Sequence, residues 1–159
     1  MSEYDPGDAG HDVADDDATV VTADYGDGSE TLIDTNADGY ADEVLVDSDG
    51  DGTADEVYSH SVGSGHQLDT FAADTDHDGR VDLLEFDRNH DGRVDLLAVD
   101  RDGDGRIDEI DSDDNFDGQV DHQILDQNFD GRADLELIDL DDGPQALPDA
   151  GTADPFATN

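Results

Sequence analysis

The sequence contains no cysteine, no tryptophan and no lysine. The absence of cysteine excludes disulfide bonds and thiolate metal ligands, and it leaves the redox compartment undetermined. Aromatic residues are few, with five Phe and four Tyr, and hydrophobic residues make up only 33% of the 159 positions. These shortages exclude a large conventional core. Together with the high charge they are typical of a chain that stays unfolded unless something other than a core stabilises it.

Positive charge is also scarce. The chain has 47 acidic residues against 6 basic ones, all arginine, and a formal net charge of −41. Such an excess opposes a compact fold through self-repulsion unless cations neutralise it. It also repels nucleic acid and anionic membranes, and no apolar run approaches the roughly 20 residues that span a bilayer. We therefore expect no nucleic-acid partner and no membrane insertion, while a protein partner stays unknown.

What the sequence has in abundance is a 13-residue repeat. The copy at 87–99 reads Asp-Arg-Asn-His-Asp-Gly-Arg-Val-Asp-Leu-Leu-Ala-Val. Acidic or amide side chains occupy positions 1, 3, 5 and 9, glycine occupies position 6, and an apolar run ends the unit. A damaged copy at 61–73 has Ser61, Gly63 and Gly65 where acids are expected. The complete copies begin at Asp34, Asp47, Asp74, Asp87, Asp100, Asp113 and Asp126.

This pattern suits a hard divalent cation. Calcium binds about six to eight oxygens, and alternate residues of a tight loop can direct their carboxylates to one centre. Glycine at position 6 permits the sharp turn, and position 7 of such loops commonly offers its backbone carbonyl. Magnesium fits less well because it demands a stricter octahedron, and zinc fits less well because the six histidines are scattered. The repeat therefore predicts about seven calcium sites.

The predicted ligands occupy five positions of each complete copy. Position 1 supplies Asp34, Asp47, Asp74, Asp87, Asp100, Asp113 and Asp126. Position 3 supplies Asn36, Asp49, Asp76, Asn89, Asp102, Asn115 and Asn128. Position 5 supplies Asp38, Asp51, Asp78, Asp91, Asp104, Asp117 and Asp130. Position 7 supplies the carbonyls of Tyr40, Thr53, Arg80, Arg93, Arg106, Gln119 and Arg132. Position 9 supplies Asp42, Asp55, Asp82, Asp95, Asp108, Asp121 and Asp134.

Two other features of the loops have simpler explanations. His77 and His90, both at position 4, are expected to be solvent-facing spacers. Four of the arginines stand at position 7, where we expect them to offset neighbouring carboxylates on the surface. These four are Arg80, Arg93, Arg106 and Arg132.

Positions 1, 3, 5, 6, 8 and 9 resemble the calcium loop of EF-hands. The pattern departs from the EF-hand at position 12, where a bidentate glutamate is expected. It is also similar to FG-GAP and thrombospondin type-3 calcium loops, and to tandem runs in uncharacterised bacterial repeat proteins. These resemblances imply calcium binding and a repetitive architecture, and they imply no reaction. Position 12 holds Leu45, Tyr58, Glu85, Ala98, Asp111, Ile124 and Leu137.

Only about four residues separate one loop from the next, which is too few for a helix and suits a short strand. We expect an all-β fold, a single-stack parallel β-solenoid of 13-residue coils, with an irregular calcium-wrapped ribbon as the alternative. The polar residues Gln123 and Glu136 fall at position 11, so the inward face is not uniform. Coils stacked at about 4.8 Å would set equivalent aspartates above one another. We therefore expect the metal-free chain to be largely disordered and calcium binding to be coupled to folding.

The repeat also divides the chain. We expect a disordered acidic tail at 1–18, a degenerate capping repeat at 19–33, tandem calcium-binding repeats at 34–142 and a second disordered tail at 143–159. Within the capping repeat, 19–22 and 31–33 read as short strands and 24–28 reads as a turn. The first residues show neither a basic nor an apolar stretch, so we expect no secretory signal peptide.

The function expected from these features is a calcium-stabilised structural or interaction module. A cytosolic calcium buffer or sensor is the alternative, and the measured affinity separates the two. Adaptation to high salt ranks third, because the acids obey a fixed register rather than spreading over a surface. No enzyme is expected, since no catalytic constellation stands out from the repeat. We favour an extracellular or cell-surface location, reached by non-classical export, over the cytoplasm.

Overall fold

The computed structural model describes residues 18–61 and 65–138. Within these residues the protein is all-β, as the sequence predicts, and it has no helix. Consequently no helix of the described part is long and apolar enough to cross a bilayer. Apart from residue 18, the two predicted tails lie outside the described residues.

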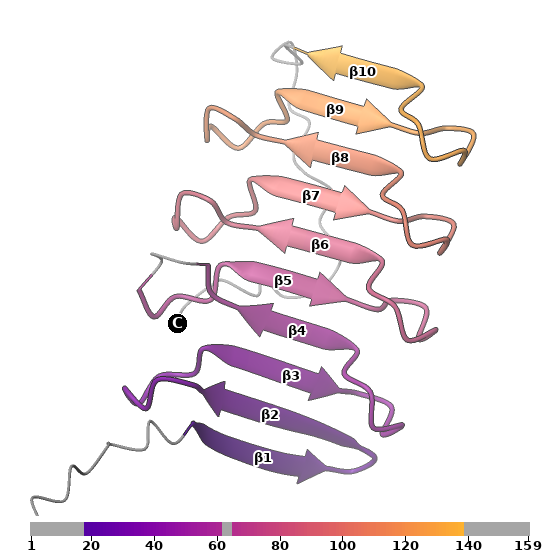
Figure 1. The fold of residues 1–159 in the computed structure, drawn as a ribbon. Coiled ribbons are helices and arrows are strands. Elements are labelled where there is room, and N and C mark those ends of the chain that lie inside the picture. Colours follow the sequence, from indigo (N-terminus) through magenta and orange to yellow (C-terminus); the bar gives the residue numbers. More distant parts are fainter. Residues whose placement is uncertain (1–17, 62–64, 139–159) are drawn as a thin grey trace, which may run out of the picture.

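Ten strands form one open sheet in which each strand is hydrogen-bonded to the next one along the chain (Figure 1). Most strands have only four residues, because positions 10–13 of a copy are all that remains between two loops. The strands are β1 (Thr19–Tyr25), β2 (Gly28–Asp34), β3 (Glu43–Asp47), β4 (Glu56–Ser59), β5 (Thr70–Ala73), β6 (Leu83–Phe86), β7 (Leu96–Val99), β8 (Glu109–Ser112), β9 (His122–Leu125) and β10 (Leu135–Ile138).

The parallel β-solenoid is wrong, because every pair of neighbouring strands is antiparallel. The physical reason lies in the loop. Its nine residues turn the chain back on itself, so each 13-residue unit is half of a hairpin rather than one full coil. The strands are regular, so the described part is not an irregular ribbon either. Equivalent aspartates of consecutive copies therefore lie at opposite edges of the sheet and do not stack at the spacing between strands.

The region expected to cap the repeats forms a hairpin. β1 and β2 pair over their full length, from Thr19 opposite Asp34 to Tyr25 opposite Gly28. Both strands are longer than the sequence indicates, and the connection is the two residues Gly26 and Asp27, with Gly26 at a φ of +68°. The outer strand β1 is exposed along all seven residues.

The antiparallel arrangement explains why the apolar pattern slips from copy to copy. Residues paired across antiparallel strands share a face, and neighbouring strands run in opposite directions. As a result, position 11 of one copy shares a face with position 12 of the next, as Leu97 does with Asp111 and Asp111 does with Gln123. Gln123 at position 11 is therefore no defect, since its neighbour on that face is the buried Asp111.

The apolar core is small and centres on Phe71 in β5, of which only 1% is exposed. Tyr58 lies beside it with ring centroids 4.9 Å apart, and Ala73, Leu83 and Val94 complete the cluster. Val94 comes from position 8 of a loop, so the apolar residue at that position packs against the sheet. Burial of this one aromatic cluster contributes a few kcal/mol at about 25 cal/mol per Å² of apolar surface.

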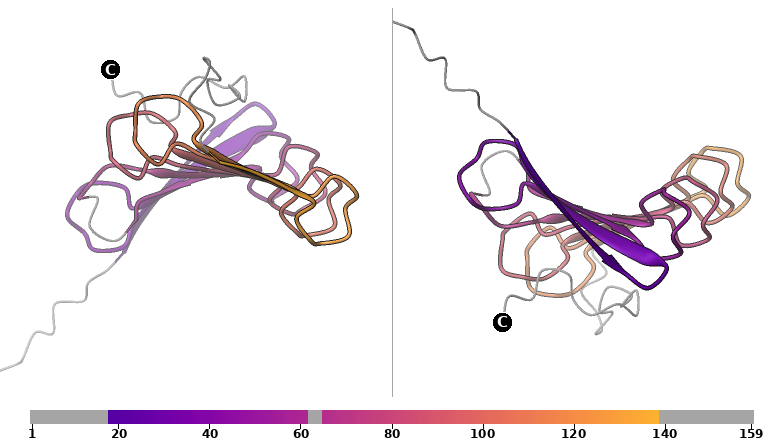
Figure 2. Two further views of the ribbon diagram at one scale, coloured as in Figure 1. Left: turned by 90° about the horizontal axis from the view of Figure 1, so that it is seen from above. Right: turned by 90° about the horizontal axis from the view of Figure 1, so that it is seen from below.

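The loops form two columns, one on each of the two sides of the twisted sheet at which the strands begin and end (Figures 1 and 2). These two sides are called the first and the second edge. The first edge, on the right in Figure 1, carries the complete loops 47–55, 74–82, 100–108 and 126–134. The second edge carries the complete loops 34–42, 87–95 and 113–121, together with the damaged loop 61–69. Loops on one edge belong to alternate copies of the repeat.

Candidate metal centre

Each loop is closed by backbone contacts at its two ends. The N–H of position 9 donates to the carbonyl of the residue that precedes the loop, as from Asp82 to Ala73 at 2.9 Å and from Asp95 to Phe86 at 2.8 Å. The same bond recurs in all seven complete loops. Position 9 is therefore both the last residue of the loop and the point from which the next strand begins.

The carboxylates at positions 1 and 9 brace the loop from inside. In all seven complete loops the position 1 carboxylate accepts a hydrogen bond from the N–H of the glycine at position 6, at 2.7–3.0 Å. The position 9 carboxylate accepts one from the N–H of position 2, at 2.7–3.1 Å. These bonds from the loop backbone hold both carboxylates in place, and the residue types at positions 1, 6 and 9 supply them in every complete copy.

Shorter turns hold the middle of the loop. In loop 87–95 the Asn89 side chain accepts from the N–H of Asp91 at 2.8 Å, and the Asp91 carboxylate accepts from the N–H of Arg93 at 3.0 Å. Asn and Asp favour such turns because their short side chains reach the backbone two residues on. The N–H of position 7 is thus bonded to the side chain of position 5, and the use of the position 7 carbonyl as a calcium ligand stays a prediction.

Positions 4 and 6 have positive φ in every complete loop. Glycine is present at position 6 throughout, with φ between +79° and +93°. Position 4 lies in the left-handed region, where side chains cost about 1–2 kcal/mol, and yet it is glycine in only two of the seven loops. Its occupants are Ala37, Gly50, His77, His90, Gly103, Phe116 and Phe129.

In each of three loops, three carboxylate oxygens of that loop lie within 4.8 Å of one another. All three loops lie on the first edge of the sheet. In loops 47–55 and 74–82 the oxygens belong to positions 1, 3 and 5, and in loop 100–108 they belong to positions 1, 3 and 9. The groups are Asp47, Asp49 and Asp51; Asp74, Asp76 and Asp78; and Asp100, Asp102 and Asp108.

The other four complete loops have asparagine at position 3. In three of these loops the amide donates to the closing carboxylate directly, as from Asn115 Nδ2 to Asp121 Oδ1 at 3.1 Å and from Asn36 Nδ2 to Asp42 Oδ1 at 3.2 Å. Loop 34–42 also contains an unpartnered buried atom, Asp34 Oδ1, which among the described residues is the one buried side-chain oxygen or nitrogen without a hydrogen bond. Predicted ligands from both ends of these loops therefore meet as well.

The crowded carboxylates perturb one another. Burial raises the pKa of Asp102, with the charges of Asp104, Asp108 and Asp100 adding to the rise and the N–H of Asp104 opposing it. Burial likewise raises the pKa of Asp95 against the opposing N–H bonds of its loop. A cation bound among the carboxylates of a loop would offset the part of the rise that comes from neighbouring negative charges.

The histidines do more than space the loops. His77 and His90 are partly exposed, as expected, but His77 Nδ1 lies 2.8 Å from Asp55 Oδ1 on the neighbouring loop of the first edge. His90 Nδ1 similarly lies 3.4 Å from Asp69 Oδ2 on the second edge. The ligand atoms of Asp49, Asp55 and His77 form a further group within 4.8 Å. Sequence reasoning missed this group because its members come from two copies that only the antiparallel topology brings together.

Two of the arginines reach across to a neighbouring loop. Arg80 Nη1 donates to the carbonyl of Gly103 at 3.1 Å. Arg88, at position 2, donates to the carbonyl of Asp113 at 2.7 Å and to Asp114 Oδ1 at 3.3 Å. The expectation that the position 7 arginines offset neighbouring carboxylates is met by Arg106, whose Nη1 lies 3.9 Å from Asp104 Oδ2, while Arg80 bonds a backbone carbonyl.

The damaged copy keeps its closing residue but loses the rest of the ligand pattern. Ser61, at position 1, donates its N–H and hydroxyl to Asp69 at 2.6 and 2.5 Å. Gly63 lies outside the described residues. Asp69, which is 2% exposed, is therefore the one carboxylate of the damaged loop, among its described residues, at a position where the complete loops have a predicted ligand.

A family model described as EF hand matches residues 72–88 of the chain. The match covers loop 74–82, the last two residues of β5 and all of β6, where an EF-hand has helices. Glu85, at position 12 of this copy, is buried in β6 and paired with Leu97. Comparison with curated proteins and with solved structures found no match. The EF-hand match and the aspartate groups together point to calcium binding.

Proposed function

We propose that the seven complete loops each bind one calcium ion, and that the protein is a structural or interaction module that calcium stabilises. The proposal rests on three groups of aspartates, in each of which the carboxylate oxygens lie within 4.8 Å of one another. One of the groups lies inside the segment that matches the EF hand. The proposal assigns no reaction to the chain.

The donor set fits calcium better than its competitors. The side chains at positions 1, 3, 5 and 9 offer only carboxylate and amide oxygens, which hard cations prefer. The unpartnered Asp34 Oδ1 is an oxygen to which a cation would supply the missing partner. Position 7 would add a backbone carbonyl, and water would complete the coordination. The bound ion would supply positive charge at the centre of each loop. In loop 87–95, for example, the carboxylates of Asp87, Asp91 and Asp95 would hold it.

The charge of the chain connects binding to stability. Seven divalent ions would offset about a third of the formal net charge of −41. Because ligands that bind only the folded state stabilise it by mass action, the sheet should gain stability with each loop that fills. The loops lie along both edges of the sheet, so occupied loops would brace it over its full length.

The chemistry of the loop also favours a setting rich in calcium. EF-hand loops close their site with a bidentate glutamate at position 12, and here that position is part of a strand. A site without that ligand should bind in the range of about 10⁻⁴–10⁻³ M, which is typical of extracellular modules. We therefore propose an extracellular or cell-surface role.

Thermal unfolding of the full chain tests the proposal. Circular dichroism should show a higher melting temperature in millimolar calcium than in chelator, with little effect of magnesium at the same concentration. The variant Asp74→Asn, in the segment that matches the EF hand, should lose part of the calcium-dependent rise. Asp24→Asn, on the exposed strand β1, removes the same charge outside any loop and serves as the matched control. Identical melting curves in calcium and chelator would contradict the proposal.

A further inference from the structure

The two edges of the sheet do not carry equivalent loops. On the first edge, three of the four complete loops have aspartate at position 3, namely Asp49, Asp76 and Asp102, and the last has Asn128. On the second edge, all three complete loops have asparagine there, namely Asn36, Asn89 and Asn115. A loop with aspartate at position 3 presents four carboxylates at positions 1, 3, 5 and 9, and a loop with asparagine presents three.

Loops on the same edge are joined through the backbone of their proposed ligands. The N–H of position 1 donates to the carbonyl of position 9 in the preceding loop of that edge. On the first edge these bonds run from Asp74 to Asp55 and from Asp100 to Asp82, both at 2.8 Å. On the second edge the bond from Asp113 to Asp95 is also 2.8 Å. The first residue of one proposed site is therefore hydrogen-bonded to the last residue of the preceding site on the same edge.

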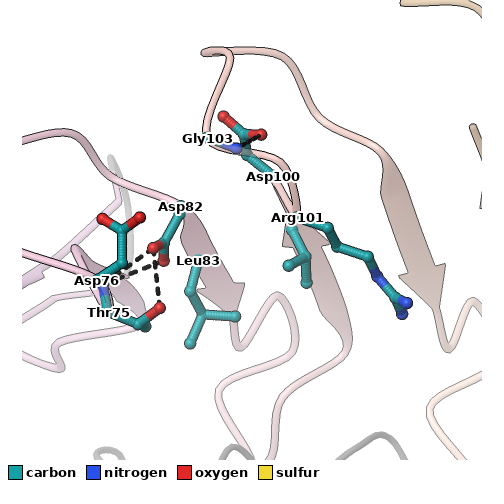
Figure 3. A pocket seen from close by; sticks show the side chains of 8 residues that line it. Thr75, Asp76, Asp82, Leu83, Asp100, Arg101 and Gly103 are labelled. Carbon is teal, nitrogen blue, oxygen red and sulfur yellow. Dashed lines mark hydrogen bonds between the residues drawn. The ribbon is translucent and has the colours of Figure 1, made fainter. Parts of the chain in front are cut away.

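Side chains add to these links on both edges. On the second edge Arg88 of loop 87–95 donates to the carbonyl of Asp113 at 2.7 Å. On the first edge the link joins loops 74–82 and 100–108. Loops 74–82 and 100–108 enclose a hollow lined by Asp76, Asp82, Asp100 and Arg101 among others (Figure 3). The bond from Arg80 to the Gly103 carbonyl bridges the same two loops. Among the described residues, loops that are consecutive in the sequence have no such link, because a four-residue strand, roughly 14 Å at 3.4 Å per residue, separates them.

The second edge is interrupted. Its loop 34–42 is separated from loop 87–95 by the damaged loop 61–69, which has Ser61 in place of the aspartate at position 1. Histidines contact the carboxylates of loop 34–42 instead, with His60 Nε2 2.7 Å from Asp42 Oδ1 and His66 Nδ1 3.3 Å from Asp38 Oδ2. The first edge has four complete loops without a break.

We infer that the calcium sites form two separate columns, with the tighter and more strongly coupled column on the first edge. The inference rests on the proposed function. It follows from two general relations: calcium affinity rises with the number of charged ligands, and repeats that contact each other fill cooperatively. Loops 47–55, 74–82 and 100–108 should therefore fill before loops 34–42, 87–95 and 113–121. Coupling should run between copies 26 or 27 residues apart rather than between consecutive copies.

A calcium titration followed by ¹H–¹⁵N NMR of the full chain tests the inference loop by loop. The glycine N–H at position 6 bonds the position 1 carboxylate, so its amide signal reports on its own loop. Gly52, Gly79 and Gly105 should shift at lower calcium than Gly39, Gly92 and Gly118. A single midpoint for all glycines, or an order that follows the sequence, would overturn the inference and leave the proposed function intact. No glycine shift at millimolar calcium would contradict the proposed function itself.

Two matched substitutions sharpen the test. Asp76→Asn removes one carboxylate from loop 74–82 and should raise the calcium midpoint of Gly79 by on the order of tenfold, since one charge at ligand distance is worth at least that much. It should also raise the midpoints of Gly52 and Gly105, which lie on the same edge, more than that of Gly92. The converse change, Asn89→Asp, should lower the midpoint of Gly92. Equal effects on Gly92 and Gly105 from Asp76→Asn would overturn the coupling along an edge.

Discussion

The hydroxyl and the backbone N–H of Ser48 both donate hydrogen bonds to the carboxylate of Asp55, at the opposite end of the same loop. His77 of the neighbouring loop approaches the other oxygen at 2.8 Å. The carboxylate thus joins the start of its loop, the end of its loop and a second loop. Three contacts from two loops therefore hold this one carboxylate.

The acid stability of the sheet should depend on this contact. The Ser48 hydroxyl, the His77 imidazole and the Ser48 N–H together lower the pKa of Asp55 from 3.8 to about 2. Because the pKa is lower in the folded state, the carboxylate stabilises the fold above pH 3.8, and this contribution is lost as the pH falls towards 2. Ser48→Ala should raise the pKa of Asp55 and move acid unfolding to higher pH. Carboxyl ¹³C NMR in chelator measures the first effect and circular dichroism the second. Ser29→Ala, in β2, is the control, and an unchanged Asp55 pKa would contradict the assignment.

Asp111 should have the opposite effect. It lies in β8, 3% exposed, and it accepts a hydrogen bond from Gln123 Nε2 at 2.7 Å. Burial raises the pKa of Asp111, the Gln123 bond opposes that rise, and the charge of Glu109 adds to it. A raised pKa means that ionisation costs folding free energy, so stability falls as the pH rises through the folded-state pKa.

Asp111→Asn keeps an acceptor for Gln123 and removes the charge. The variant should melt a few degrees higher than the native chain at pH 7, and the difference should vanish below pH 3.8, where both side chains are neutral. Asp24→Asn, on exposed β1, tests whether any charge removal has the same effect. Thermal unfolding in chelator across this pH range measures both. A variant less stable than the native chain at pH 7 would show that the ionised carboxylate is itself stabilising.

The two glycines of loop 100–108 should respond differently to alanine. Gly105, at position 6, has a φ of +89° with open space around its Cβ position, so Gly105→Ala should cost about 1–2 kcal/mol from backbone conformation alone. Gly103, at position 4, has a φ of +72°, closer than that of Gly105 to the left-handed conformation at about +57° that a side chain can adopt, and other copies have alanine, histidine or phenylalanine there. Gly103→Ala should therefore cost less. Urea unfolding of the two variants compares them directly, and an equal or larger loss for Gly103→Ala would contradict the distinction.

The small core makes the fold sensitive to one aromatic residue. Phe71 is almost fully buried and contacts Tyr58, and it lies in the damaged copy rather than in a complete loop, so its truncation removes no proposed calcium ligand. Phe71→Ala should cost about 3–5 kcal/mol of folding free energy. Val20→Ala, on a side chain that is 59% exposed, should cost well under that amount. Denaturant unfolding in millimolar calcium measures both, and similar losses would show that the cluster around Phe71 does not stabilise the sheet.

Much of the local structure could be predicted from the sequence. The apolar run after each loop predicts strands, and β6 through β10 each occupy positions 10–13 of a copy. The direction of those strands could not be predicted, because a repeat of 13 residues has the same period whether each loop completes a coil or reverses the chain. The change from Ala98 to Asp111 at position 12 of two consecutive copies was the available signal, since a parallel stack would keep one position on one face and these two residues lie on opposite faces.

The candidate sites divide in the same way. The contacts within a loop follow from residue types at fixed spacing, as with the bond from Gly92 to Asp87. The contacts between loops could not be predicted, because the group of Asp49, Asp55 and His77 depends on which copies share an edge. That depends on strand direction, on which the solenoid expectation was wrong.

Counting the calcium ions bound by the full chain tests the central claim most directly. Equilibrium dialysis against radioactive calcium, with excess magnesium present, gives the number of ions per chain. The account predicts a stoichiometry close to seven at saturating calcium, one ion for each complete loop. A chain that binds no calcium at millimolar concentration, or that releases it all to magnesium, would contradict it.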